Sequence, residues 1–174
     1  MGRFNINMVD VIQNKKNRLD LSHDELEYAF NGFLKGDIPD YQMSALLMAI
    51  CINGMTERET LDLTDVFIKS GNTLDLSSIK GFKIDKHSTG GVGDKTTLVV
   101  GSIVASLGGK VAKMSGRGLG ITGGTIDKLE SIPGFKTSLT KEEFIKQVDE
   151  IGFAVTSQTD DLVPMDKKVY ALRD

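Results

Sequence analysis

The chain has 174 residues, enough for one ordinary domain or two small ones, and 40% of them are hydrophobic, enough to build a core. Its formal net charge of −3 argues against general nucleic-acid binding, which usually accompanies an excess of basic residues. No apolar stretch of the sequence reaches the length of a membrane span, and the N-terminus lacks the layout of a signal peptide, so we expect a cytoplasmic protein without a membrane partner.

The sequence contains one cysteine, Cys51, which lies in an apolar run. A single cysteine cannot form a disulfide within the chain, and this agrees with a reducing compartment. The apolar neighbours favour a buried small side chain over a reactive thiol.

The first 70 residues predict a small helical bundle. Apolar residues between 8 and 12 give a first amphipathic turn or two. Ser22 and Glu25 form a capping box, because the side chain of each can accept a hydrogen bond from the backbone N–H of the other. The helix that they open should end near Gly36, since glycine is common just past the end of a helix.

Two further helices are predicted in this part of the chain. Pro39 starts the first, whose body at 43–52 is apolar nearly all round, and such a helix should be packed on several sides. A second capping box, at 56–59, opens a helix that runs to about residue 70.

From about residue 80 the pattern changes to alternating strands and helices. Residues 81–85 predict a strand, the apolar run 98–107 predicts a buried helix, and 110–114 predict a second strand. A strand, a helix and a strand at this spacing form a βαβ unit, so we expect the two strands to be parallel.

The remaining elements follow the same alternation. A third capping box, at 140–143, opens a helix that ends at Gly152, and residues 153–156 predict a third strand. Pro164 then starts a final helix that runs to Arg173.

These elements predict an all-α part followed by an α/β part. We expect a helical bundle domain at 1–70, joined to the first part of a phosphate-binding α/β domain at 80–160 with a parallel or mixed sheet. We expect a helix at 163–174 to return to the helical domain.

The glycine-rich run from Lys86 to Thr97 carries the clearest chemical signal. It lies on a turn from a strand into a helix, where several backbone N–H groups can point at one atom and the helix N-terminus adds partial positive charge. Lys86 and the hydroxyls of Ser88, Thr96 and Thr97 add charge and donors. The ligand that suits this arrangement is an oxyanion, most simply phosphate.

A second loop rich in glycine, serine and threonine, at 115–125, follows the next predicted strand. Ligands of parallel α/β sheets bind outside the carboxyl ends of the strands, so both loops should face one crevice. Two lysines at strand ends and four hydroxyls are the candidate phosphate ligands: Lys86, Lys113, Ser88, Thr97, Ser115 and Thr125.

Four residues in or near these loops also have a purely structural interpretation. His87 suits proton transfer or charge stabilisation, because imidazole is the usual acid–base group near neutral pH, but it can equally serve only to orient the loop. Lys113 can be a ligand or a solvated strand end. Asp85 and Asp94 flank the first loop and can simply pin it.

Three long motifs, KHSTGGVGD at 86–94, KMSGRGLG at 113–120 and TGGTIDKLESIPGF at 122–135, closely resemble the thymidine/pyrimidine-nucleoside phosphorylase family. The resemblance extends over nearly the whole chain and includes residues 36–45 and 170–174. Members of this family cleave a pyrimidine nucleoside with phosphate and release the free base and a pentose 1-phosphate.

The resemblance implies roles for individual residues. It makes Lys86, Ser88, Thr97, Lys113, Ser115 and Thr125 phosphate ligands, and it places His87 beside the departing base as the catalytic residue. Tyr170 and Arg173 match positions that contact the base. The backbone oxygens of Gly93 and Lys95 match ligands of a potassium ion in some members. The implied substrates are therefore a pyrimidine nucleoside and inorganic phosphate, with no organic cofactor.

Two features depart from the family pattern. Residue 121 is isoleucine, where the family usually has histidine. Family members are also more than twice as long, so the later serine and lysine that help to bind the base are missing from this sequence. We therefore expect either an expressed fragment or a truncated gene product.

Two alternatives belong to other functional classes. A phosphoribosyltransferase of the related anthranilate type would need acidic residues placed for magnesium and diphosphate. A non-enzymatic remnant would act only as a dimerisation module. The helical domain mediates dimer contacts in the family, so the resemblance also implies a homodimer.

Overall fold

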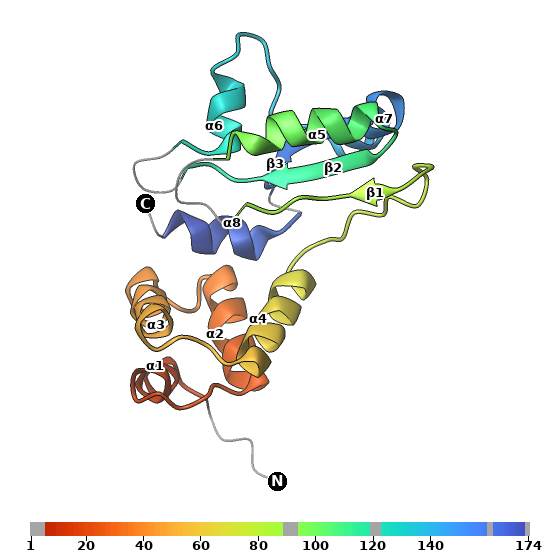
Figure 1. The fold of residues 1–174 in the computed structure, drawn as a ribbon. Coiled ribbons are helices and arrows are strands. Elements are labelled where there is room, and N and C mark those ends of the chain that lie inside the picture. The colour runs from red at the N-terminus through yellow and green to blue at the C-terminus, as the bar shows by residue number, and fades with distance from the viewer. Residues whose placement is uncertain (1–5, 89–93, 119–122, 160–161, 173–174) are drawn as a thin grey trace. The chain divides into compact units, whose positions relative to one another are not determined.

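The computed structural model describes residues 6–88, 94–118, 123–159 and 162–172. The chain divides into two compact units (Figure 1). The first comprises residues 1–72 together with 163–172, and the second comprises residues 73–162 with 173–174.

The first unit is a bundle of helices: α1 (Met8–Lys16), α2 (His23–Lys35), α3 (Asp40–Asn53), α4 (Glu57–Lys69) and α8 (Pro164–Ala171). Two capping boxes start helices where the sequence predicts them. Ser22 and Glu25 exchange hydrogen bonds at the start of α2, and Thr56 and Glu59 do so at the start of α4. Gly36 ends α2 in a left-handed conformation with φ 89°, which glycine adopts without steric cost.

The core of this unit lies between α2 and its neighbours. Leu26, Phe30 and Phe33 from one face of α2 are fully buried there with Met43 of α3. The final helix α8 adds Met165 to the same core.

A lysine of α8 also contacts the end of α2. Lys168 Nζ donates to the carbonyl oxygen of Phe33 at 2.5 Å and lies 4.6 Å from the centre of the Phe33 ring. The last carbonyls of a helix have no partner within the helix, so a cation at this position satisfies one of them.

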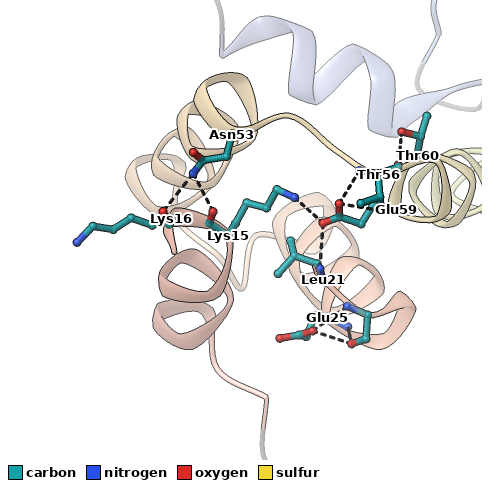
Figure 2. A network of polar contacts seen from close by, with 9 residues as sticks. Lys15, Lys16, Leu21, Glu25, Asn53, Thr56, Glu59 and Thr60 are labelled. Carbon is teal, nitrogen blue, oxygen red and sulfur yellow. Dashed lines mark hydrogen bonds and ion pairs between the residues drawn. The ribbon is translucent and has the colours of Figure 1, made fainter. Parts of the chain in front are cut away.

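A buried polar network connects α1 to α4 (Figure 2). Glu59 is 1% exposed, and its Oε1 accepts hydrogen bonds from Lys15 Nζ at 2.6 Å and from the backbone N–H of Leu21 at 2.9 Å. Its Oε2 accepts from the backbone N–H of Thr56 at 2.8 Å. Asn53 Nδ2 donates to the carbonyl oxygen of Lys15 at 2.9 Å, so α3 is connected to the end of α1 as well.

The prediction that α3 is packed on several sides is wrong. Only Met43 and Leu46 of this helix are fully buried. Residues at helical spacing on another face are exposed, among them Tyr41, Met48 and Ile52. Cys51 is exposed too, so the prediction that it is a buried small side chain is also wrong. The helix contacts α1 and α2, which cover one side of it, and among the described residues the apolar side chains of its other side stay exposed.

The second unit contains the α/β elements β1 (Lys83–Ile84), α5 (Thr96–Ser106), β2 (Lys110–Ser115), α6 (Thr125–Glu130), α7 (Lys141–Ile151) and β3 (Phe153–Ser157). The strands form one sheet in the order β1-β2-β3. Both pairings are parallel, with Lys83 opposite Lys110 and Lys113 opposite Val155. The predicted fold class, a helical bundle with an α/β part and a parallel sheet, is confirmed.

Helix α5 lies on the sheet through a glycine. A Cβ atom on Gly101 would come within 2.6 Å of the Phe153 ring of β3, a distance that real contacts do not reach. Thr97 and Gly101 are the buried residues of this helix, whereas Val99, Ile103 and Leu107 just after it are exposed. The prediction of a buried helix therefore holds for one face of α5 only.

No helix in the described part of the chain combines the length and the apolar character needed to cross a membrane.

Candidate functional site

Lys86 and the start of α5 lie side by side at the carboxyl end of β1. Lys86 follows β1, and its Nζ donates to Thr97 Oγ1 at 3.0 Å and to Asp94 Oδ1 at 2.5 Å. Thr97 is in the first turn of α5, where backbone N–H groups have no partner within the helix. Its N–H donates to Asp94 Oδ1 at 3.1 Å.

The carboxylate of Asp94 is the centre of this cluster. Besides Lys86 and the Thr97 backbone, it accepts hydrogen bonds from the hydroxyls of Thr96, at 3.0 Å, and Thr97. Thr125 Oγ1, at the start of α6, lies 3.2 Å from the Asp94 carbonyl oxygen and 3.4 Å from Oδ2. Burial by itself raises the pKa of Asp94, but the hydrogen bonds from Lys86, Thr97 and Thr96 outweigh it and hold the pKa far below its ordinary value.

A second carboxylate, Asp85, joins Lys86 to Lys113. Asp85 Oδ1 accepts from the backbone N–H of Lys86 at 2.8 Å and lies 3.2 Å from Lys113 Nζ. Lys113 belongs to β2 and is only 7% exposed, so it is not the solvated strand end that the sequence left open as an alternative. Ser115 ends β2, is half-buried, and lies opposite Ser157 of β3.

The second loop is held by an acidic residue of α6. Asp127 Oδ2 accepts hydrogen bonds from the backbone N–H groups of Gly118, at 2.6 Å, and Gly124, at 2.8 Å. Burial raises the pKa of Asp127, and these bonds together with one from Arg117 lower it below its ordinary value. A Cβ atom on Gly124 would lie 2.4 Å from the backbone carbon of Arg117, so the two ends of the loop meet at a position that only glycine can occupy.

Arg117 makes the second contact that positions this loop. Its guanidinium donates to Asp127 at 3.0 Å and to both carboxylate oxygens of Glu130, at 2.7 and 2.9 Å. Sequence reasoning did not single out Arg117, Asp127 and Glu130. The available signal was the acidic residue three positions after Gly124, which is the spacing of a capping box.

The other predicted residues have less defined surroundings. His87 is exposed, and Ser88 is half-buried and has a polar partner. Tyr170 lies on α8 of the helical unit and is exposed. Gly93, Ile121 and Arg173 lie outside the described residues.

The potassium site implied by the resemblance can be examined only at Lys95. This residue is the N-cap of α5, and its side chain is exposed. Backbone carbonyl oxygens are suitable ligands for potassium, but one described residue does not define a coordination shell. Potassium therefore stays a prediction.

Three of the candidate phosphate ligands contact the same acidic residue, Asp94. Lys86, Thr97 and Thr125 come from three separate segments, and all three contact Asp94. An ammonium group, two hydroxyls and the first turn of a helix are together the groups that bind an oxyanion. In the structure these groups hold one oxyanion, the carboxylate of Asp94.

Two family models match the chain. Residues 80–174 match the α/β domain of a glycosyl transferase family, and residues 9–71 match the helical bundle domain of a glycosyl transferase family.

The chain is also similar to pyrimidine-nucleoside phosphorylases. It is 59% identical over 167 residues to the protein of that name from Geobacillus stearothermophilus, and 58% identical to that from Bacillus subtilis. The match covers 96% of this chain but 39% of each relative, so the chain spans about two-fifths of the length of these proteins.

Among solved structures, anthranilate phosphoribosyltransferase from Thermus thermophilus matches with a TM-score of 0.65 and 16% sequence identity, over 94% of this chain and 50% of that one. At this identity the likeness shows a common fold. Because the α/β domain model covers more than half of the chain, this protein belongs to the glycosyl transferase family that the model describes.

Proposed function

We propose that this chain forms the phosphate-binding part of a pyrimidine-nucleoside phosphorylase, a pentosyltransferase. The observation that carries the proposal is the identity of 52–59% over 167 residues to proteins of that name. The match covers 96% of this chain, and the candidate ligands stand in its two glycine-rich loops.

The proposed reaction is the phosphorolysis of a pyrimidine nucleoside. An oxygen of phosphate forms a bond to C1′ of the pentose, and the bond between C1′ and N1 of the base breaks. The electron pair of the broken bond moves onto the pyrimidine ring, which takes up the proton that hydrogen phosphate gives up and leaves as the neutral base. The other product is a pentose 1-phosphate.

Each candidate residue has a role in this scheme. Six residues hold the phosphate in line with C1′: Lys86, Ser88, Thr97, Lys113, Ser115 and Thr125. His87 lies beside the base and stabilises the charge that gathers on the ring, because a donor aimed at developing charge lowers the barrier. Tyr170 and Arg173 contact the base, and the backbone oxygens of Gly93 and Lys95 would hold a potassium ion.

The cluster around Asp94 favours the phosphate-binding part of this proposal. A site that already holds a carboxylate with an ammonium group, hydroxyls and a helix N-terminus has the donors that a phosphate needs. The likeness to anthranilate phosphoribosyltransferase concerns the fold alone and gives that reaction no comparable support.

The proposal is tested first by phosphate binding to the chain of 174 residues and then by activity. For activity, residues 1–174 are joined to the remaining part of the Geobacillus stearothermophilus relative. The chimaera is expected to release uracil from uridine, or thymine from thymidine, only when phosphate is present. Base release without phosphate, or none while the unmodified relative is active, would contradict the proposal. A requirement for magnesium would instead favour phosphoribosyl transfer.

A variant of the same chimaera tests the role of Lys86. Lys86→Met keeps the length of the side chain and removes its charge, so the KM for phosphate should rise by about tenfold or more, as expected for a charge-assisted hydrogen bond. Lys110→Met is the matched control, because Lys110 begins β2, at the end opposite to Ser115. This variant should leave the KM for phosphate nearly unchanged.

The proposed assembly is a homodimer formed through the helical unit, in the cytoplasm. The exposed apolar residues of α3 support the first part: Tyr41, Met48 and Ile52 lie on one face of this helix at 73%, 58% and 72% exposure. A contiguous exposed apolar patch is typical of a protein–protein interface.

A further inference from the structure

The hydrogen-bond donors of the candidate phosphate site are already committed to Asp94. A threonine hydroxyl has one hydrogen, and that of Thr97 is directed to Asp94 Oδ2. The backbone N–H of Thr97 is directed to Asp94 Oδ1 at 3.1 Å. The hydroxyl of Thr125 faces the Asp94 carbonyl oxygen at 3.2 Å, with Oδ2 at 3.4 Å.

Lys86 is also engaged with this carboxylate. An ammonium group has three N–H donors, and two of those of Lys86 are directed to Asp94 Oδ1, at 2.5 Å, and to Thr97 Oγ1, at 3.0 Å. A phosphate that bound while Asp94 stayed in place would therefore meet the lone pairs of Thr97 and not its hydrogens.

The charge of Asp94 adds to this conflict. An aspartate carboxylate is negatively charged at neutral pH. Its oxygens accept the hydrogen bonds from Lys86 and Thr97 that a phosphate bound to these two side chains would need. Two anions cannot share donors at contact distance without strong repulsion.

We propose that Asp94 is an internal placeholder for phosphate, which holds Lys86, Thr97 and Thr125 in the absence of the anion and is displaced when the anion binds. The inference rests on the proposed phosphate site and adds a positioning residue to it. The tethered carboxylate keeps the ammonium group and the hydroxyls together, so the site does not have to assemble when phosphate arrives. In exchange, phosphate has to compete with a carboxylate of the same chain, which makes Asp94 a determinant of affinity.

The test compares phosphate binding to the wild-type chain and to Asp94→Asn by titration calorimetry. Asparagine has the same shape and can still accept the N–H of Thr97 through its side-chain oxygen, so the start of α5 is retained. Asparagine lacks the negative charge and competes less with phosphate for the same donors. Phosphate should therefore bind at least about tenfold more tightly, which is the effect of gaining one charge-assisted hydrogen bond.

Asp85→Asn is the matched control. Asp85 is a carboxylate close to Lys86 and Lys113, but it accepts no hydrogen bond from Thr97 or Thr125 among the contacts of the described residues. If Asp85→Asn tightens phosphate binding as much as Asp94→Asn, the effect is one of general charge and the placeholder role is refuted.

A second measurement uses the wild-type chain and does not depend on a variant that folds. The carbon-13 resonance of the Asp94 carboxyl group is followed by NMR during a titration with inorganic phosphate. It should move to the position of a solvated carboxylate as the site fills, and a resonance that stays constant at saturation overturns the inference.

The outcomes separate this inference from the function on which it rests. If the wild type binds phosphate and Asp94→Asn binds it more weakly, the phosphate site is supported but the displacement of Asp94 is refuted. Asp94 would then position the ligands while the anion is bound. Absence of phosphate binding in both proteins refutes the site and the placeholder together.

Discussion

Thr97 makes more contacts in the candidate site than its size suggests. It is 2% exposed, its hydroxyl accepts a hydrogen bond from Lys86 and donates one to Asp94, and its backbone N–H binds the same carboxylate. A buried hydroxyl with partners on both sides positions the lysine and the aspartate relative to each other. Loss of that hydroxyl should therefore affect ligand binding and stability together.

Thr97→Val tests this residue, because valine keeps the branched shape and removes the hydroxyl. We expect phosphate affinity to fall about tenfold and the free energy of unfolding to fall by about 1–3 kcal/mol, the cost of leaving a buried polar partner unsatisfied. Titration calorimetry and chemical denaturation measure the two effects. Thr96→Val removes an exposed hydroxyl that also contacts Asp94, and it should change both quantities much less.

The sequence singled out candidate phosphate ligands, a role that stays a prediction, but it did not place the carboxylate that three of them surround. Lys86, Thr97 and Thr125 are recognisable because lysines and hydroxyls stand beside glycines at strand ends, and the structure does bring these three together. The position of Asp94 at their centre could not be predicted, because an acidic residue beside a loop can equally pin it from outside. Which way its side chain points depends on the turn into α5, and residue types alone do not determine that turn.

At the level of elements, the Glu59 carboxylate connects pieces of the helical unit that are far apart in sequence (Figure 2). It binds Lys15 at the end of α1, Leu21 in the link to α2, and Thr56 at the start of α4. Burial raises the pKa of Glu59, but the hydrogen bonds from Leu21, Lys15 and Thr56 lower it below the ordinary 4.5.

Glu59→Gln should therefore destabilise the helical unit in a pH-dependent way. Removing one partner of a buried ion pair costs about 3–5 kcal/mol at neutral pH. The pKa of Glu59 is lower in the folded than in the unfolded chain, so its contribution is complete above 4.5 and is lost as the pH falls through the folded pKa.

The difference in unfolding free energy between wild type and Glu59→Gln should therefore shrink below pH 4.5, as measured by urea denaturation at several pH values. Glu57→Gln, an exposed carboxylate in the same first turn of α4, is the control and should show a small difference. A Glu59→Gln effect that is equally large at low pH would contradict the role of the ionised carboxylate.

The contact between α5 and the sheet sets where the first turn of α5 lies. Gly101 touches the Phe153 ring so closely that an added Cβ atom would come within 2.6 Å. Gly101→Ala should therefore destabilise the α/β unit by about 1–3 kcal/mol, although alanine is the better helix former.

Thermal unfolding followed by circular dichroism measures this effect. Ser102→Ala, at the next and exposed position of α5, is the control and should leave the melting temperature unchanged or slightly raised. A stable Gly101→Ala variant with an unchanged melting temperature would mean that the helix does not need this close approach.

Helix starts were predictable from sequence, whereas the burial of helix faces was not. Capping boxes fix the starts of α2, α4 and α7 by bonds between residues three apart, so the signal is local. The faces of α3 and α5 that carry Met48 and Ile103 are apolar and yet exposed. The apolar character of a helix face does not reveal which segment or which other protein covers it, or whether anything covers it.

At the scale of the whole molecule, the exposed face of α3 makes the proposed homodimer testable. Met48→Glu puts a charge in the centre of that face, where an interface would have to desolvate it, so the dimer should dissociate at least tenfold more readily. Sedimentation velocity at several concentrations measures this dissociation.

Leu107→Glu places the same charge on an exposed apolar position of the α/β unit, at 82% exposure. It should leave the association of the helical units unchanged. A wild-type chain that sediments as a monomer at all concentrations, or a Met48→Glu variant that still associates as the wild type does, would contradict a dimer built on α3.

The helical unit is interrupted in sequence, because residues 163–172 belong to it as well as residues 1–72. Met165 lies in the same core as Phe33, and Lys168 binds a carbonyl oxygen 135 residues earlier in the chain. On the ribosome, α1 to α4 emerge long before α8 does. The nascent bundle therefore lacks α8, and part of its core stays uncovered, until the whole α/β unit has been synthesised. The helical unit is the first to be translated but can be completed only after the α/β unit.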